Sequence, residues 1–236
     1  MTKDDVFVVL GTAHLITTPG KRSPDGAFRE AVYSREIVSR VESQLLAQGV
    51  KVLVDYPDLE PYKEIVAGSP AEQNSRELAY RVATVNQLCK ERGTKNCLYV
   101  SIHVNAAGNG SEWRNAGGWS VYTSIGQTRG DKLATCLYEA ANRNLKGYEA
   151  WMAEGKKSGA YGQSQRAFRT DTSDGDPDME ANLYVLKNTK CAACLTENLF
   201  QDNRSDVAYL TSEEGKAAIV ATHVEGIINY IREEML

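Results

Sequence analysis

Hydrophobic residues occur along the chain in two patterns: short continuous runs, and positions spaced three or four apart. The continuous runs predict buried β-strands at residues 6–10, 50–54, 97–102, 119–123, 183–187 and 192–196. The helical spacing predicts α-helices at about residues 29–48, 75–92, 131–145 and 212–232. The chain therefore begins strand, helix, strand, helix, strand, which is the order of a parallel sheet with helical crossovers.

This alternation predicts a single α/β domain over residues 1–236, with three layers and a mostly parallel, six-stranded twisted sheet between helices on both faces. Two segments do not fit the alternation, and we interpret them as insertions at about residues 56–74 and 147–182. The first holds three prolines and Gly68, which favour a long loop. The second has an acidic centre at residues 171–178. It resembles a calcium loop but lacks EF-hand spacing, so we interpret it as a solvated loop.

The composition is that of an ordinary globular protein, with 42% hydrophobic and 25% charged residues among 236. The net charge is −4 and no basic stripe occurs, so we expect no nucleic-acid partner. The run at residues 6–10 is too short for a signal-peptide core, and no stretch approaches a membrane span, so we expect no membrane insertion. The five cysteines, including the Cys191 and Cys194 pair, are expected to be free thiols.

Candidate catalytic side chains occur where predicted strands end. His14 follows the first strand by four residues, and His103 follows the third by one. Glu30 lies in the first turn of the first helix, and Glu197 directly follows the last strand. Because the carboxyl ends of parallel strands share one edge, where ligands bind, we expect these four side chains to meet.

Two imidazoles and one carboxylate form a familiar catalytic zinc shell, which leaves a fourth position for water. A second carboxylate can then accept a proton as general base. The spacing alone allows Glu30 to bind the metal and Glu197 to act as base, or the reverse. The alternative is that both histidines are ordinary hydrogen-bonding residues and that Glu30 only stabilises a helix dipole. His223 lies on or near the apolar stripe of the last helix, so we expect it to be a packed or surface histidine and not a metal ligand.

At these residues the sequence resembles the zinc-dependent N-acetylmuramoyl-L-alanine amidases of the type-3 family, which includes cell-wall hydrolases and sporulation and cell-division amidases. The family's Ser-Ile-His-x-Asn-Ala block is nearly literal at residues 101–106, and its Arg-x-x-x-x-Asn helix matches Arg81 and Asn86. Its late block matches residues 183–189 and 195–197. The opening block is divergent, because Gly-Thr-Ala-His14 replaces Asp-x-Gly-His and the glycines that usually follow are lost.

The resemblance implies that His14, Glu30 and His103 hold one zinc ion and that Glu197 is the catalytic carboxylate. It implies hydrolysis of the amide between N-acetylmuramic acid and L-alanine of the peptidoglycan stem peptide by a single amidase catalytic domain. Candidate substrate contacts are Asn105, Arg166 and Arg169; for the segment that holds the two arginines, a surface loop with its own packed cluster is the alternative. Two other functions stay open, namely another zinc peptidase or amidohydrolase acting on cell-wall peptides, and a non-catalytic peptidoglycan-binding relative.

The resemblance also implies where the protein acts and in which oligomeric state. We expect a monomer that acts on the cell wall, in the periplasm or outside the cell, as an autolysin or lysin. Because no signal peptide is visible, we expect cytoplasmic synthesis with later release, or a chain from which a leader has been removed.

Overall fold

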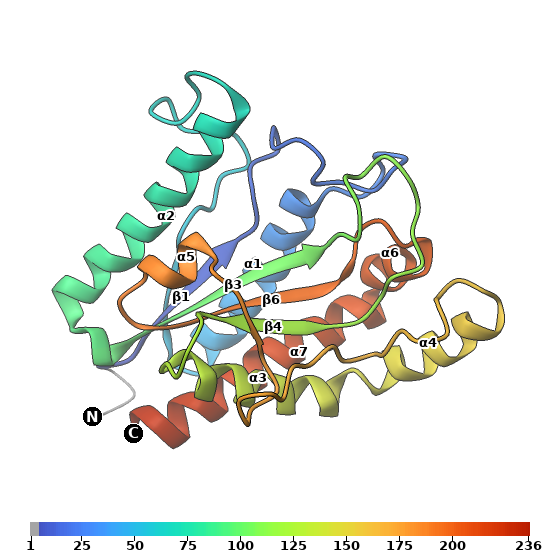
Figure 1. Cartoon of the computed structure of the whole chain (residues 1–236). Coiled ribbons are helices and arrows are strands. Elements are labelled where there is room, and N and C mark those ends of the chain that lie inside the picture. Colours follow the sequence, from blue (N-terminus) through green and yellow to red (C-terminus); the bar gives the residue numbers. More distant parts are fainter. Residues whose placement is uncertain (1–4) are drawn as a thin grey trace.

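A six-stranded sheet crosses the middle of the molecule in the computed structural model, which describes residues 5–236 (Figure 1). The strands are β1 (Phe7–Thr12), β2 (Lys51–Val54), β3 (Cys97–Asn105), β4 (Ser120–Thr123), β5 (Met179–Glu180) and β6 (Ala192–Phe200). Their order across the sheet is β2-β1-β3-β6-β4-β5. The first four of these are mutually parallel, β4 is antiparallel to β6, and β5 is parallel to β4. The predicted α/β class with a mostly parallel six-stranded sheet is therefore confirmed.

Helices cover both faces of this sheet (Figure 1). On one face lie α1 (Glu30–Ala47), α3 (Gly130–Asn144) and α7 (Glu213–Tyr230), with α7 packed against both of the others. On the other face lie α2 (Pro70–Arg92) and α5 (Tyr184–Asn188). Because successive strand residues point to opposite faces, Val8 and Leu10 of β1 enter the first core and Val9 enters the second. Three layers result, as predicted.

The sixth strand is not the one that the sequence predicts. The predicted strand at residues 183–187 is replaced by the short helix α5 (Tyr184–Asn188), and the strand at that edge of the sheet is β5. The neighbouring residues Val185 and Leu186 are both buried in the core beneath α2. Adjacent residues of a strand cannot share a face, whereas adjacent residues of a helical turn can. A five-residue apolar run does not by itself distinguish the two.

Helix α2 begins five residues before its predicted start. The hydroxyl of Ser69 accepts a hydrogen bond from the backbone N–H of Glu72, and the Glu72 carboxylate accepts one from the backbone N–H of Ser69. Pro70 occupies the first helical position, where its missing N–H costs nothing. The proline that suggested a loop is therefore part of a helix-starting capping box.

The segment at residues 147–182 is only partly a loop. It opens within helix α4 (Lys146–Lys157), which contains two glycines that argue against a helix in the sequence. Gly155 lies so close to Tyr161 that an added Cβ would be 2.5 Å from its ring. The buried rings of Tyr161 and Tyr148 join the larger core, so the interpretation as a separate loop is wrong for α4. Helix α6 (Arg204–Thr211), capped by the Asn203 side chain, is likewise not predicted.

All five cysteines are free and buried, as expected. Cys191 packs in the core beneath α2, whereas Cys194 packs in the core on the opposite face of the sheet. Residues three apart along a strand point to opposite sides, so this spacing does not bring the two thiols together.

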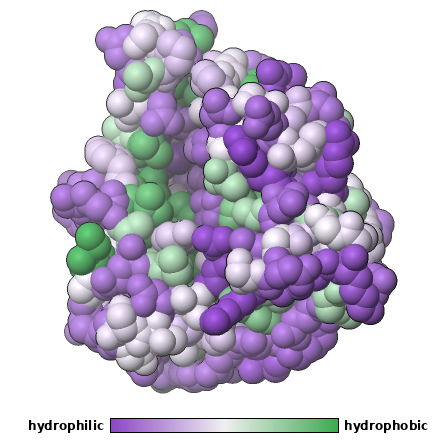
Figure 2. Space-filling model, turned by 45° about the vertical axis from the view of Figure 1, so that its right-hand side comes forward, coloured by the Kyte–Doolittle hydropathy of each residue, from purple (hydrophilic) through white to green (hydrophobic). Residues whose placement is uncertain are grey.

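The surface seen in Figure 2 is mostly hydrophilic, and it is hollowed beside the projecting upper part of the molecule, where hydrophobic residues gather. Within residues 5–236, no helix combines the length and the apolar character that crossing a bilayer requires.

Candidate metal and catalytic site

Three of the predicted site residues meet at the carboxyl edge of the sheet. His14 comes from the turn after β1, Glu30 begins α1, and His103 lies on β3. One donor atom from each lies within 4.8 Å of the other two. Oε1 of Glu30 is 3.1 Å from Nδ1 of His103, and Oε2 of Glu30 is 3.7 Å from Nε2 of His14. Oε2 of Glu30 is buried and has no hydrogen-bond partner among residues 5–236, so this donor set fits a zinc ion.

Glu197 faces this cluster from the neighbouring strand. The sequence places His103 and Glu197 just after their strands, but β3 and β6 are longer than predicted and the two residues pair directly in register. The flanking Thr196 and Asn198 are buried and hydrogen-bonded, to Nε2 of His223 at 2.8 Å and to the carbonyl of His103 at 2.9 Å. These bonds fix the strand on both sides of Glu197. His223 is fully buried, so of the two roles expected for it, packed or surface, the structure shows the packed one.

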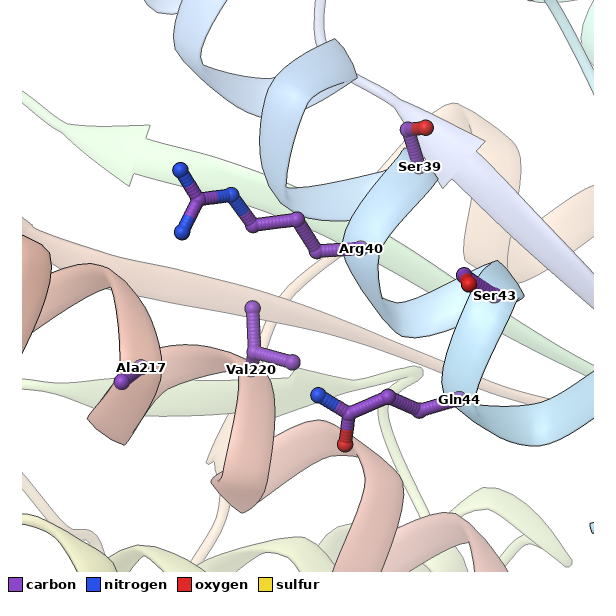
Figure 3. Close-up of a pocket in the computed structure, with 6 residues that line it drawn as sticks. All are labelled: Ser39, Arg40, Ser43, Gln44, Ala217 and Val220. Carbon is purple, nitrogen blue, oxygen red and sulfur yellow. The ribbon is translucent and has the colours of Figure 1, made fainter. Parts of the chain in front are cut away.

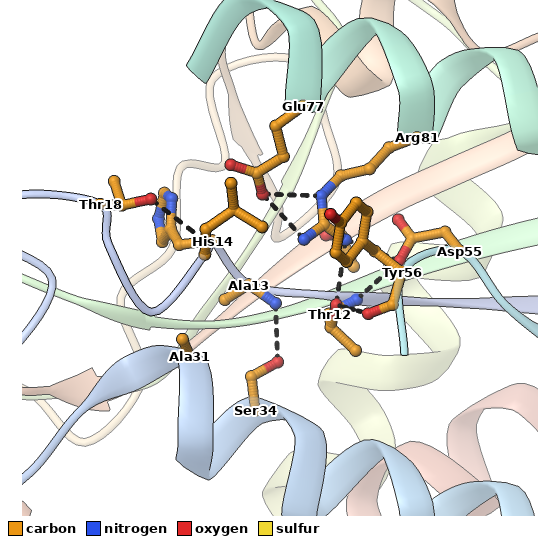
Figure 4. Close-up of polar contacts among 12 residues, drawn as sticks. Thr12, Ala13, His14, Thr18, Ala31, Ser34, Asp55, Tyr56, Glu77 and Arg81 are labelled. Atoms are coloured by element: carbon orange, nitrogen blue, oxygen red, sulfur yellow. Dashed lines mark hydrogen bonds and ion pairs between the residues drawn. The ribbon is translucent and has the colours of Figure 1, made fainter. Parts of the chain in front are cut away.

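The turn that carries His14 adopts an uncommon backbone conformation, with a φ of 44° at His14 itself. Side chains of α1 hold this turn in place (Figure 4). The hydroxyl of Ser34 accepts from the N–H of Ala13 at 2.8 Å and donates to the carbonyl of Ile102 at 2.6 Å. Nη1 of Arg35 donates to the carbonyls of Ala13 and His14, both at 3.0 Å. The divergent opening block therefore still delivers its histidine to the site.

The pKa values of the two carboxyl groups of the site are shifted in opposite directions. Burial tends to raise the pKa of Glu30, but His14 and the hydrogen bond with His103 bring that pKa down to about 2. Burial, followed by the charge of Glu30, raises the pKa of Glu197 well above its usual value. Burial also lowers the pKa of His14 to about 3, so its imidazole is neutral, which is the form that binds metals. Such a divided pair of carboxylates is typical of acid–base sites.

A cavity of about 230 Å³ opens at the site. His14, His103 and Glu197 line it together with Lys21 and with residues of α2 and α5. The predicted site residues are thus brought together in a hollow that has polar groups on one side and apolar side chains such as Leu195 on another.

Two buried residues of α2, Glu77 and Arg81, also line this cavity, and neither was assigned to the site from the sequence. Nη1 of Arg81 donates to Oδ1 of Asp55 at 2.7 Å, and Nη2 donates to Oε1 of Glu77 at 2.8 Å (Figure 4). Oε2 of Glu77 has no partner among the described residues. The signal available in the sequence was the Arg-x-x-x-x-Asn pattern. Its Asn86 serves elsewhere, by bonding the backbone of Asn188 and Lys190 ahead of β6.

A larger hollow, of about 510 Å³, lies between α1 and α7 (Figure 3). Its lining residues are Ser39, Arg40, Ser43, Gln44, Ala217 and Val220. None of them is a histidine, cysteine or carboxylate, and Arg40 is engaged by Glu36 and Glu213. The smaller cavity at the sheet edge is therefore the one whose chemistry suits hydrolysis.

The three candidate substrate contacts lie at different places. Asn105 ends β3 on the same face as His103, and its side chain accepts from the N–H of Ala106. Arg166 is exposed, and Arg169 stacks over the ring of Phe200 at 5.2 Å. None of the three lines the cavity with His14 and Glu197, so their contact with substrate stays a prediction.

Known proteins that are similar to this chain point to one family. A family described as N-acetylmuramoyl-L-alanine amidase matches residues 8–229. The endolysin of Bacillus phage SPP1 is 29% identical over 145 residues, which are 61% of this chain and 43% of the endolysin. The chain thus spans less than half the length of this curated relative.

Solved structures share the fold at low sequence identity. The CwlD amidase from Clostridioides difficile, solved in complex with the GerS lipoprotein, has a TM-score of 0.72 at 18% identity, covering 96% of this chain and 98% of that one. The catalytic domain of CwlV, an N-acetylmuramoyl-L-alanine amidase from Paenibacillus polymyxa, has a TM-score of 0.66 at 17% identity, covering 96% and 98%.

Proposed function

Because the chain belongs to the type-3 N-acetylmuramoyl-L-alanine amidase family, we propose that it hydrolyses the amide between N-acetylmuramic acid and L-alanine of peptidoglycan. One observation carries the proposal: His14, Glu30, His103 and Glu197, which are far apart in the chain, line or adjoin one cavity. Cleavage of this bond separates the stem peptide from the glycan strand.

His14, Glu30 and His103 would hold one zinc ion. The set contains two nitrogen donors and one carboxylate, as in catalytic zinc sites, and the unpartnered Oε2 of Glu30 is a buried oxygen that a cation would satisfy. The Ser101 hydroxyl lies 3.0 Å from Nε2 of His103, so the other ring nitrogen, Nδ1, faces the site. When bound, zinc supplies a Lewis acid that polarises a carbonyl and lowers the pKa of water.

Glu197 would be the general base. Its raised pKa makes the ionised carboxylate a stronger proton acceptor than a solvent-exposed glutamate, which suits the removal of a proton from water. The same carboxyl group would then return the proton to the leaving amine of L-alanine. Its place in β6, held by the bonded residues on either side, keeps its carboxyl group beside the cavity during both transfers.

Zinc content and the cleaved bond, measured on the same preparations, test these roles. Purified cell-wall sacculi are incubated with enzyme, and new amino-terminal alanine is quantified. Glu197→Gln should keep about one zinc per chain and lose about 10²–10⁴-fold in rate. His103→Ala should lose both zinc and activity. Glu36→Gln is the matched control, since Glu36 is a half-buried acid of the same helix as Glu30 and pairs with Arg40 and Lys216.

The outcomes separate the alternatives. Full activity in Glu197→Gln would overturn the base assignment. Release of peptide fragments without amino-terminal alanine would indicate another zinc peptidase. Binding of sacculi with no cleavage by the zinc-loaded wild type would indicate a non-catalytic peptidoglycan-binding protein.

We further propose that the protein acts on the cell wall as a monomer. The protein could reach the wall by export or after release from the cytoplasm. Measuring its amount in the cytoplasm and outside the cell, before and after lysis, distinguishes the two routes. Sedimentation of the zinc-loaded chain at micromolar concentration tests the monomer.

A further inference from the structure

The loop that leads into β5 carries aspartates at three alternate positions, Asp174, Asp176 and Asp178. One carboxylate oxygen from each lies within 4.8 Å of the other two. The three are not equally placed, since Asp174 is exposed, Asp176 is half-buried and Asp178 is only 2% exposed. The interpretation of this stretch as a solvated loop is therefore wrong at its C-terminal end.

Asp178 is a buried carboxyl group that the protein satisfies only in part. The hydroxyl of Thr123, at the end of β4, donates to Oδ2. Oδ1 is buried and has no hydrogen-bond partner among residues 5–236. The Asp176 carboxyl group faces the same side chain, and burial together with that contact raises the pKa of Asp178 to about 7. Either a proton or a cation must therefore compensate these two groups.

No positive side chain among residues 5–236 compensates these carboxyl groups. Within residues 5–236, the ion pairs formed by lysine, arginine and histidine involve none of the three aspartates. The further charged group that acts on Asp178 is Asp131, which is also negative. A buried carboxylate with an unpaired oxygen and only acidic neighbours is costly unless a cation joins it.

We propose that Asp174, Asp176 and Asp178 bind one calcium ion. Carboxylate oxygens are the ligands that hard cations prefer, whereas zinc favours nitrogen and sulfur donors. Calcium accepts six to eight oxygens in flexible arrangements, so an irregular loop that offers three carboxylates and leaves the remaining positions to water suits it. Magnesium requires a near-ideal octahedron and is the poorer match.

The site stands apart from the catalytic centre, so calcium would stabilise the fold rather than take part in turnover. Ser120 of β4 pairs with Glu197, and β4 then runs antiparallel to β6 away from the rim. Thr123, three residues further, is about 10 Å along the strand. A cation there would tie the loop to β4 and to the adjoining edge strand β5.

Calcium binding is tested on the zinc-loaded protein by isothermal titration calorimetry and thermal unfolding at pH 8. The wild type should bind one calcium ion per chain. Its Tm should rise by about 5 °C or more once calcium exceeds its Kd 100-fold. Magnesium at the same concentration should give a clearly smaller shift; an equal or larger one would overturn the preference for calcium.

Three variants locate the site. Asp176→Asn and Asp178→Asn should abolish the heat of calcium binding and the calcium-induced rise in Tm. Asp174→Asn changes only an exposed side chain, so it should weaken both signals without destabilising the fold. Asp171→Asn is the control, because Asp171 is an exposed acid of the same loop whose hydrogen-bond partner among the described residues is Ser173. The proposal would be overturned if the wild type showed no heat of calcium binding, or if Asp174→Asn and Asp176→Asn kept the full calcium-induced rise in Tm.

Discussion

Protonation of His223 is expected to destabilise the fold below pH 6.5. The side chain is fully buried between α7 and β6. Its Nδ1 lies 2.7 Å from the carbonyl of Ile219, so Nδ1 must carry the proton and donate. Nε2 then has a free lone pair and accepts from the hydroxyl of Thr196 at 2.8 Å. A second proton on Nε2 would abolish that bond and place a charge in the core.

The size of the effect follows from the two pKa values. Burial lowers the pKa of His223 in the native state to about 4, against 6.5 in the unfolded chain. Above pH 6.5 both states are neutral and the full stability is present. Between pH 6.5 and 4 the unfolded state binds a proton that the native state rejects, so stability falls as pH falls. Each pH unit is worth about 1.4 kcal/mol, which gives a total loss of about 3 kcal/mol.

Urea unfolding of the wild type and of His223→Gln, followed by circular dichroism between pH 8 and 4.5 with the same zinc content, measures this loss. Other groups titrate in both proteins, so their contributions cancel in the difference. The wild type should lose about 2–3 kcal/mol more than the variant on going from pH 7 to 4.5. Parallel stability curves would refute the reasoning. So would an imidazole NMR titration that places the native pKa of His223 near 6.5.

The remaining predictions concern buried contacts, and each is checked by the free energy of unfolding in urea. Arg81→Met should cost about 3–5 kcal/mol, because two buried carboxylates lose their shared cation, and a change below 1 kcal/mol would contradict the pairing. Gly226→Ala should cost about 1–3 kcal/mol, because the new Cβ would lie 2.8 Å from Cα of Leu137 where α7 crosses α3; a neutral effect would mean that the helices separate freely. Asn203→Ala should cost about 1–2 kcal/mol through loss of the α6 cap, and an unchanged stability would remove that role.

The sequence predicted the elements whose burial pattern is regular. Strand β1 and helix α1 were placed to within one or two residues, because a continuous apolar run and a helical stripe each have one simple interpretation. The elements that were predicted wrongly depend on tertiary contacts. Helix α4 tolerates Gly155 because the ring of Tyr161 occupies the space beside it, and no local pattern reports that contact.

The same distinction applies to the site. His14, Glu30, His103 and Glu197 could be predicted to converge, because the edge of a parallel sheet collects whatever follows its strands. Glu77 could not, because it reaches the cavity from the middle of α2, and the angle at which a helix crosses the sheet is set by side-chain packing.

The turn at His14 shows how a divergent motif can keep its position. A left-handed φ is costly for a residue with a Cβ, and the glycines that would relax the neighbouring backbone are missing. The cost is met by bonds from residues that are not part of the motif: Ser34 bridges the turn to β3, and Arg35 clamps two of its carbonyls. Both come from α1, which also begins with Glu30. One helix therefore positions two of the three metal-binding candidates, so a change in α1 would displace His14 and Glu30 together.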